Sequence, residues 1–314
     1  MLAYIFRRIL ATIPVMGVVA LFVFLMLRLS PGDPAAVIAG DYATTEDVER
    51  IREQLGLNEP IFVQFTTWLG SLLQGDLGIS IFTNLPVTTL IAQRLEPTIM
   101  LTLTTIIFTI IVAVPLGTIA AWKAGSIIDR LVMLFSVAGF SIPVFVLGYI
   151  LIYILSMQLK WLPVQGYKSL FTDGIIPFTR HIILPTVTLS VIFIALIARM
   201  TRASVMEVLQ EDYVRTARAK GQNEMKVLLR HALRNAAVPI VTVIGLGIAL
   251  LIGGVVVTES VYNIPGLGRL VLDAVLKRDY PIIQGLILLF SFVYILVNLI
   301  IDLAYTLFDP RIRY

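Results

Sequence analysis

Six long apolar runs dominate the chain, and polar or charged segments separate them. The runs cover residues 9–29, 98–122, 131–157, 182–198, 236–258 and 282–303. A helix of about 20 apolar residues crosses the roughly 30 Å of hydrocarbon in a bilayer. Because most of these runs reach that length with scarcely a charge, the pattern predicts an all-α membrane protein with six transmembrane helices.

The first run, within the segment 1–29, is expected to stay in the membrane as an anchor. The alternative is a cleaved secretory signal, whose apolar region would be shorter and would end at a cleavage site of small residues. Here Arg7 and Arg8 precede about 20 apolar residues, and the run is followed by Arg28-Leu-Ser-Pro-Gly-Asp. These features favour a first membrane span.

Lysine and arginine indicate which loops face the cytoplasm. They gather at the N-terminus, at Lys123 and Arg130, in the loop 200–235 and in the C-terminal tail. Cytoplasmic loops carry the excess of basic residues in membrane proteins. Both termini are therefore predicted to be cytoplasmic.

The opposite loops are predicted to lie outside the cytoplasm. Residues 30–97 read as an extracytoplasmic cap with interfacial helices, one over 62–73 and another that begins at Pro86. The loop 259–281 follows the fifth run, with a turn at 262–269 and a short surface or re-entrant helix after it. The transmembrane core is thus expected to cover 98–314.

Composition excludes a soluble protein and argues against nucleic-acid binding. Hydrophobic residues make up 58% of the 314, charged residues 14%, and the mean hydropathy is +0.92. A soluble chain could not bury so much apolar surface. The net charge of +4 is placed in loops between apolar runs rather than on a soluble basic domain. With no cysteine, the chain has no disulfide framework.

The chain has no residues from which a catalytic or metal site can be assembled. It contains no Gly-x-x-x-x-Gly-Lys-Ser/Thr stretch, so it is not expected to bind or hydrolyse ATP by itself. The two histidines, His181 and His231, lie near opposite membrane faces and cannot form a zinc pair or a histidine-based triad. We therefore predict no enzyme activity, no metal and no cofactor in this chain.

The cores of the apolar runs lack acidic and basic side chains, and Asp302 lies only near an inner edge. Carriers driven by protons or ions usually keep an ionisable group inside the helix bundle. The energy for transport is therefore expected to come from another protein. A self-sufficient channel or secondary carrier is the alternative, which flux through the chain alone in liposomes would favour.

The coupling segment, residues 211–235, is the most cationic stretch of the chain. It is predicted to form a helix, a turn at Gly221 and a second helix that dock on a cytosolic protein. The residues expected at that interface are Tyr213, Val214, Arg215, Thr216, Ala217, Arg218, Ala219, Lys220 and Gly221. Tyr213 and Val214 offer an apolar knob, and the arginines suit an acidic groove. An ordinary basic cytoplasmic loop would explain the charges but not the alanines or the glycine.

Two further patterns lie within the apolar runs. Four threonines share one helix side and are candidates to line a polar path, or they bond their own helix's carbonyl groups; they are Thr98, Thr102, Thr105 and Thr109. Three small residues are spaced by four, which predicts a face for close helix packing within the chain or with a partner; they are Gly245, Ala249 and Gly253.

The coupling segment resembles the cytoplasmic signature of the membrane subunits of binding-protein-dependent ABC importers. That signature is Glu-Ala-Ala, three residues, Gly, nine residues, then Ile-x-Leu-Pro. With its glycine on Gly221, the positions Ala217 and Leu233 match, whereas Arg215, Thr216, His231 and Arg234 depart. The divergent form is similar to the dipeptide/oligopeptide/nickel branch, which carries Arg-Thr-Ala-Arg-Ala-Lys-Gly followed by Arg-His-Ala-Leu-Arg-Asn.

Other stretches are similar to the same branch, and the resemblance covers nearly the whole chain. They are Arg28-Leu-Ser-Pro-Gly-Asp-Pro, Leu55-Gly-Leu-Asn-Glu-Pro, Gly75-Asp-Leu-Gly, Pro265-Gly-Leu-Gly-Arg, Arg278-Asp-Tyr-Pro and Asp309-Pro-Arg-Ile-Arg. Each stretch is a weak signal by itself, but their combination is specific for the family.

The resemblance implies a fold, a location and a set of partners. The fold is that of a type I ABC importer permease, in the cytoplasmic (inner) membrane of a bacterium. The partners are a homologous second permease, two cytosolic ATPases that bind ATP and magnesium, and an extracytoplasmic solute-binding protein. The cargo is expected to be di- or oligopeptides, with nickel chelates, glutathione, haem or another small solute as alternatives.

Overall fold

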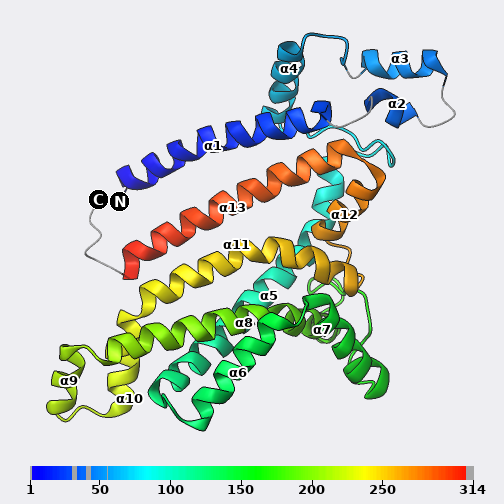
Figure 1. Ribbon diagram of the computed structural model, residues 1–314. Coiled ribbons are helices and arrows are strands. Elements are labelled where there is room, and N and C mark those ends of the chain that lie inside the picture. The colour runs from blue at the N-terminus through cyan, green and yellow to red at the C-terminus, as the bar shows by residue number, and fades with distance from the viewer. Residues whose placement is uncertain (1, 30–33, 40–43, 55, 309–314) are drawn as a thin grey trace. The chain divides into compact units, whose positions relative to one another are not determined.

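The structure is a computed structural model that describes residues 2–29, 34–39, 44–54 and 56–308. In chain order its helices are α1 (Leu2–Leu29), α2 (Pro34–Ala39), α3 (Thr45–Gln54), α4 (Ile61–Leu73), α5 (Val87–Trp122), α6 (Ile127–Ser141), α7 (Val144–Leu151), η1 (Ile152–Gln158), α8 (Ile175–Leu209), α9 (Asp212–Ala219), α10 (Glu224–Lys226), η2 (Val227–Leu233), α11 (Ala237–Val261), α12 (Leu267–Lys277) and α13 (Tyr280–Phe308) (Figure 1). η1 and η2 are wider π-helical turns that continue the helices before them. The predicted all-α class is confirmed.

Helices occupy all six predicted runs, but not all of them are straight. Within the described residues, three helices are long and apolar enough to cross a membrane: α5, α8 and α13 up to Leu303. Two bent pairs qualify only if each pair counts as one span, namely α6 with α7 and η1, bent by 104°, and α10 and η2 with α11, bent by 61°. In α1, the apolar part Leu10–Met26 is shorter than the 18 residues required of a candidate span.

The third predicted span, 131–157, is not one continuous helix. α6 ends at Ser141, Ile142 is extended, and Pro143 precedes the first residue of α7. Proline lacks an N–H and disfavours helical geometry in the residue before it, so the chain bends here. Hydropathy registers the apolar run 131–157 but not such a bend within it.

Two other helices extend beyond their apolar runs. α5 begins at Val87 rather than at residue 98, so the separate helix predicted to begin at Pro86 is wrong. α8 covers Ile175–Leu209 instead of 182–198. Polar residues at the ends of both helices keep helical backbone geometry but lie outside a hydropathy window, which is why the sequence underestimated their length.

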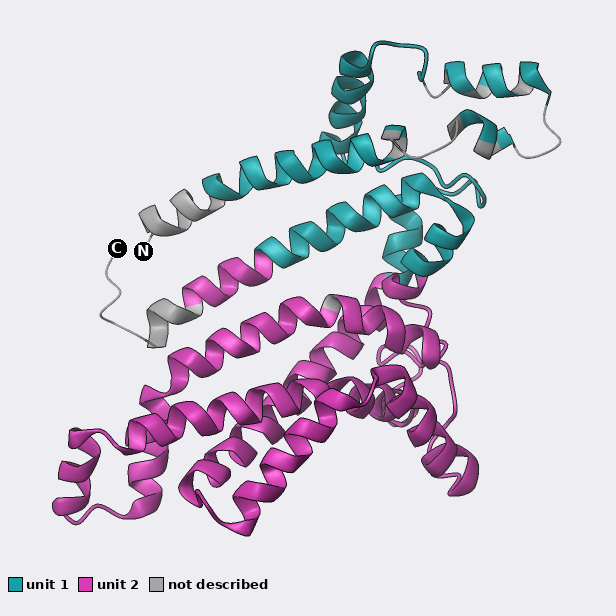
Figure 2. Ribbon diagram, in the orientation of Figure 1, with its two compact units in different colours: residues 1–94, 270–295 teal, residues 95–269, 296–314 magenta. Residues whose placement is uncertain are grey.

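The chain divides into two compact units, which Figure 2 colours separately: residues 1–94 with 270–295, and residues 95–269 with 296–314. In the first unit α4 packs on α1, where Phe24 lies 5.1 Å from Phe65 and 5.7 Å from Trp68 between ring centroids. Ser80 Oγ donates to Asp279 Oδ2 at 2.6 Å. Residues of the predicted cap thus pack against α1 and against the segment that follows α12.

The second unit is built around α8. Its buried residues face α6 on one side and α11 on the other (Figure 1). Gly139 of α6 lets the helices approach closely, since a Cβ there would lie 3.1 Å from the Ala195 Cβ. Leu189 and Phe193 lie in the main apolar cluster with Leu251 of α11. The middle of α8 thus packs on α6 and on α11.

Candidate coupling site

The coupling segment begins where α8 ends. Glu211 caps α9 with extended backbone, and Asp212 in the first turn complements the positive end of the helix. Gly221, at φ +75°, follows the end of α9 in the left-handed region that glycine adopts without strain. Asn223 Oδ1 then accepts from the Met225 N–H at 2.9 Å and starts α10. The predicted helix, glycine turn and helix are confirmed.

The inner side of α9 is apolar. Val214, Ala217 and Val227 are buried together against Val208 and Leu209 at the end of α8. The cluster fixes α9 to α8 and to η2. Of the two residues expected to form an apolar knob, only Tyr213 is exposed. Val214 is buried, because the apolar side of α9 packs against its own chain.

The outer side of α9 is polar and basic. Tyr213 is 43% exposed, and partial burial of its ring raises the pKa of the phenol above its ordinary value. The other exposed members of the predicted interface are Arg215, Thr216, Arg218, Ala219, Lys220 and Gly221. Ala217 is buried, so only Ala219 leaves space for the close approach of a partner.

Charge on this surface is only partly compensated. Arg215 pairs with Asp212 at 3.3 Å, and Arg218 pairs with Glu224 at 2.9 Å. Further basic residues form no ion pair within the part of the chain that the structure describes; they are Lys220, Lys226, Arg230 and Arg234. The surface therefore suits a partner with acidic side chains.

An ion pair fixes the end of α8 near the coupling segment. Arg202 Nη2 donates to Asp129 Oδ2 at 2.7 Å, and Arg202 Nε also donates to the same buried carboxylate. The Gly125 N–H adds a third donor at 2.9 Å. Nearby, Gly117 of α5 lies so close to the α8 backbone that a Cβ there would overlap the Ala198 carbonyl oxygen. The end of α8 that carries α9 is thus in contact with both α5 and α6.

A second buried carboxylate lies at the opposite end of this unit. Glu259 of α11 is fully buried, accepts from Thr98 Oγ1 at 2.6 Å and from the Arg269 N–H at 3.0 Å. Thr98 Oγ1 in turn accepts from the Leu267 N–H at 2.7 Å. A side chain at Gly266 would overlap the Glu259 carboxylate, so that position must stay small. Glu259 therefore holds the loop after α11 against α5.

Sequence reasoning missed both carboxylates. Asp129 was visible only as an acid within a short basic loop, and Glu259 lay one residue beyond the predicted end of the fifth run. The one available signal for Glu259 was the glycine spacing of the following Pro265-Gly-Leu-Gly turn. Their partners lie 73 and 161 residues away in the chain, and no local pattern reveals such contacts.

The four candidate threonines have different surroundings. Thr98 belongs to the Glu259 cluster, and Thr102 Oγ1 donates to the Thr98 carbonyl oxygen at 2.7 Å. Thr105 and Thr109 are buried, and their hydroxyls have no hydrogen-bond partner among the described residues. Thr109 lines a cavity of only about 10 Å³ between α5, α8 and α11. Their role in lining a path stays a prediction.

The residues of the predicted small-residue face have different surroundings. Gly245 meets Ile301 of α13, whereas a Cβ at Gly253 would meet nothing within 4 Å. The close approach of α11 to α8 instead uses Gly247, which faces Phe193, and Gly254, where a Cβ would lie 2.8 Å from Leu189 Cδ1. Residues spaced by four stay close to one side of a helix with 3.6 residues per turn, so the role of this face in packing, within the chain or with a partner, stays a prediction. Ala249 is half-buried.

The histidines make local contacts. His181 Nδ1 lies 2.8 Å from the Pro177 carbonyl oxygen, and because a carbonyl only accepts, this nitrogen carries the proton. His231 Nε2 lies 2.8 Å from Gln222 Oε1 within the coupling segment. Among the residues that the structure describes, no group of three His, Asp or Glu side chains could hold a metal ion.

The structure combines helices long and apolar enough to cross a membrane with the basic coupling segment at the end of one of them. The chain belongs to the family described as "binding-protein-dependent transport system inner membrane component", whose model matches residues 113–314. The model of the N-terminal membrane component of the same systems matches residues 1–102. The predicted family and its location in the inner membrane are confirmed, and the chain is a permease rather than an enzyme.

Relatives of known name extend over the full chain. A probable peptide ABC transporter permease of Sinorhizobium fredii, y4tP, is 58% identical over 311 residues and covers 99% of both chains. The glutathione transport system permease GsiC of Escherichia coli K12 is 46% identical over 314 residues and covers all of both.

The solved structures support the same fold. An inward-facing methionine ABC transporter, MetNI, has a chain that matches with a TM-score of 0.57 and 17% identity, over 71% of this chain and 97% of that chain. The fold is that of a type I ABC importer permease, as predicted. The side of the membrane on which the termini lie stays a prediction.

Proposed function

We propose that this chain forms, with a homologous second permease, the path by which an ATP-driven importer takes up di- or oligopeptides. The names of two relatives support this substrate class, since one is a probable peptide permease and the other transports glutathione, itself a tripeptide. Glutathione is therefore the favoured alternative cargo. Nickel chelates, haem or another small solute stay open as further alternatives.

Two cytosolic ATPases are proposed to bind ATP and magnesium and to drive the cycle through the coupling segment. The observation that carries this proposal is the uncompensated basic surface of α9 and η2, mounted on the end of α8. ATP binding would close the ATPases, move α9 and open the path to the outside, and hydrolysis would reset it. An extracytoplasmic solute-binding protein is proposed to deliver the peptide.

The proposal is tested with the complete transporter in proteoliposomes. Lys220→Glu reverses an exposed, unpaired charge, and Gly221→Pro forbids the left-handed turn after α9. Both variants are expected to lower peptide-stimulated ATP turnover at least tenfold. Lys123→Glu, an exposed charge outside the coupling segment, is the control and should leave turnover unchanged. Full coupling in the Lys220 and Gly221 variants would overturn the proposal.

The cargo is tested separately on the purified solute-binding protein of the same transporter. Calorimetric titration with dipeptides, longer peptides, glutathione and a nickel chelate compares the candidate classes directly. Tight binding of peptides supports the proposed substrate. Binding of glutathione or the nickel chelate alone would contradict it and leave the coupling mechanism unaffected.

A further inference from the structure

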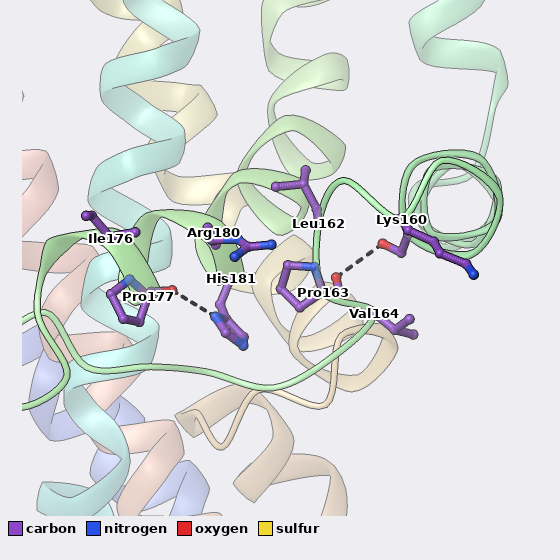
Figure 3. Close-up of a pocket in the computed structure, with 9 residues that line it drawn as sticks. Lys160, Leu162, Pro163, Val164, Ile176, Pro177, Arg180 and His181 are labelled. Atoms are coloured by element: carbon purple, nitrogen blue, oxygen red, sulfur yellow. Dashed lines mark hydrogen bonds between the residues drawn. The ribbon is translucent and has the colours of Figure 1, made fainter.

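A pocket of about 480 Å³ lies at the end of α8 opposite to the coupling segment. Its walls come from the end of η1, the loop that follows and the first two turns of α8 (Figure 3). α8 has 35 residues, and a rise of 1.5 Å per residue separates its ends by roughly 50 Å. The pocket is therefore independent of the site where ATPases are proposed to dock.

Backbone hydrogen bonds hold the pocket in shape. The Trp161 N–H donates to the Leu155 carbonyl oxygen at 2.9 Å, which turns the chain back over the end of η1. Farther along, the Gly166 N–H donates to the Tyr262 carbonyl oxygen at 2.8 Å and fixes the loop to the end of α11. These contacts make the pocket a built feature of the second unit.

Positive charge gathers around the pocket. Lys160, Arg180 and His181 line it, and no carboxylate does (Figure 3). Neither Lys160 nor Arg180 forms an ion pair with another described residue. Asp173, the acid of the loop between η1 and α8, pairs with Lys168 at 3.2 Å, which holds its pKa below the ordinary value. An anion in the pocket would thus meet two uncompensated cations.

Exposed apolar side chains surround these cations. Met157, Trp161, Ile175 and Ile176 are all more than half exposed, between 58% and 71%. Tryptophan beside lysine and arginine at the end of a membrane span is typical of the depth at which lipid headgroups lie. A purely aqueous anion would leave this apolar rim without a contact, whereas a lipid would cover it.

We propose that this pocket binds the phosphate group of an anionic phospholipid, with Lys160 and Arg180 contacting the phosphate oxygens. The acyl chains would then lie along the exposed apolar residues at the ends of η1 and α8. Lysine and arginine make charge-assisted contacts to the phosphate. They favour an anionic lipid over a zwitterionic one because the headgroup cation of a zwitterionic lipid offsets the charge of its phosphate.

The test uses the complete transporter in phosphatidylcholine nanodiscs that contain a small fraction of photoactivatable phosphatidylglycerol. Crosslinked peptides are mapped by mass spectrometry, and the yield within residues 156–181 is measured. We expect Lys160→Gln with Arg180→Gln to lower this yield about tenfold. Lys277→Gln, which changes an exposed lysine outside the pocket, is the control and should keep the yield. ATP turnover of each variant verifies that it has assembled.

Three results would overturn the proposal. They are an unchanged yield in the double variant, equal labelling by photoactivatable phosphatidylcholine, and no crosslink in this region while other regions are labelled. Competition by millimolar inorganic phosphate would assign the pocket to a free anion instead of a lipid. Weaker docking of the solute-binding protein with unchanged lipid labelling would assign it to an acidic protein surface.

Discussion

Glycines at two positions of the second unit show how much one added methyl group decides. Gly266 lies against the buried carboxylate of Glu259, so that even one methyl group would displace the hydrogen bonds to Thr98 and to the loop backbone. Gly253, in the middle of α11, has open space where a Cβ would stand. The same substitution therefore has opposite consequences at these positions.

Gly266→Ala is expected to lower the free energy of unfolding by about 2 kcal/mol, because the methyl group overpacks a buried polar cluster. Gly253→Ala is expected to raise it by up to about 1 kcal/mol, because alanine favours a helix interior. The midpoint of thermal unfolding of the purified transporter measures both changes. Equal midpoints for the two variants would show that the Glu259 cluster does not hold the loop.

At the scale of elements, local sequence signals predicted local structure. Gly221 predicted the turn after α9, since only a residue free to adopt positive φ ends a helix there without strain. The pattern of polar and apolar residues along α9 could not predict which of its sides packs against its own chain. Val214 is buried because α8 and η2 present Val208, Leu209 and Val227 to it. That choice depends on tertiary packing rather than on the eight residues of α9.

The sequence did not predict which distant segments pack against each other. The sequence predicted a small-residue face on α11 but not its neighbours: Gly245 contacts α13, whereas α8 contacts Gly247 and Gly254. The ion pair of Asp129 and Arg202 joins α6 and α8, and no sequence pattern in either helix predicted this contact. Periodicity therefore predicted the helices, and it could not predict their neighbours.

The link between α6 and α8 yields a prediction of its own. Asp129→Ala leaves Arg202 partly buried without its carboxylate, so we expect unfolding free energy to fall by about 2 kcal/mol. Peptide-stimulated ATP turnover should fall as well, because the end of α8 is no longer fixed to α6. Asp212→Ala removes an exposed ion pair and a favourable charge in the first turn of α9, so it should lower the thermal midpoint much less. Similar midpoints for both variants would contradict the proposed link.

For the whole molecule, function depends on partners that the family implies and that this chain lacks. Its own contribution is a set of apolar helices and a basic segment rigidly attached to one of them. Uncharged span cores suit a path for peptides of varied side chains, because a fixed charge would retain some cargo. Selectivity is therefore expected to lie mainly in the solute-binding protein.

The most direct measurement is a crosslink from the coupling segment to an ATPase in the assembled transporter. The chain has no cysteine, so Ala219→Cys introduces a unique thiol on the exposed side of α9. Thr172→Cys, exposed in the loop before α8, is the control. We predict a covalent product with an ATPase subunit from Ala219→Cys alone, with a yield that changes on ATP binding. An assembled, active transporter in which the Ala219→Cys thiol reacts freely with maleimide and forms no such product would contradict the account.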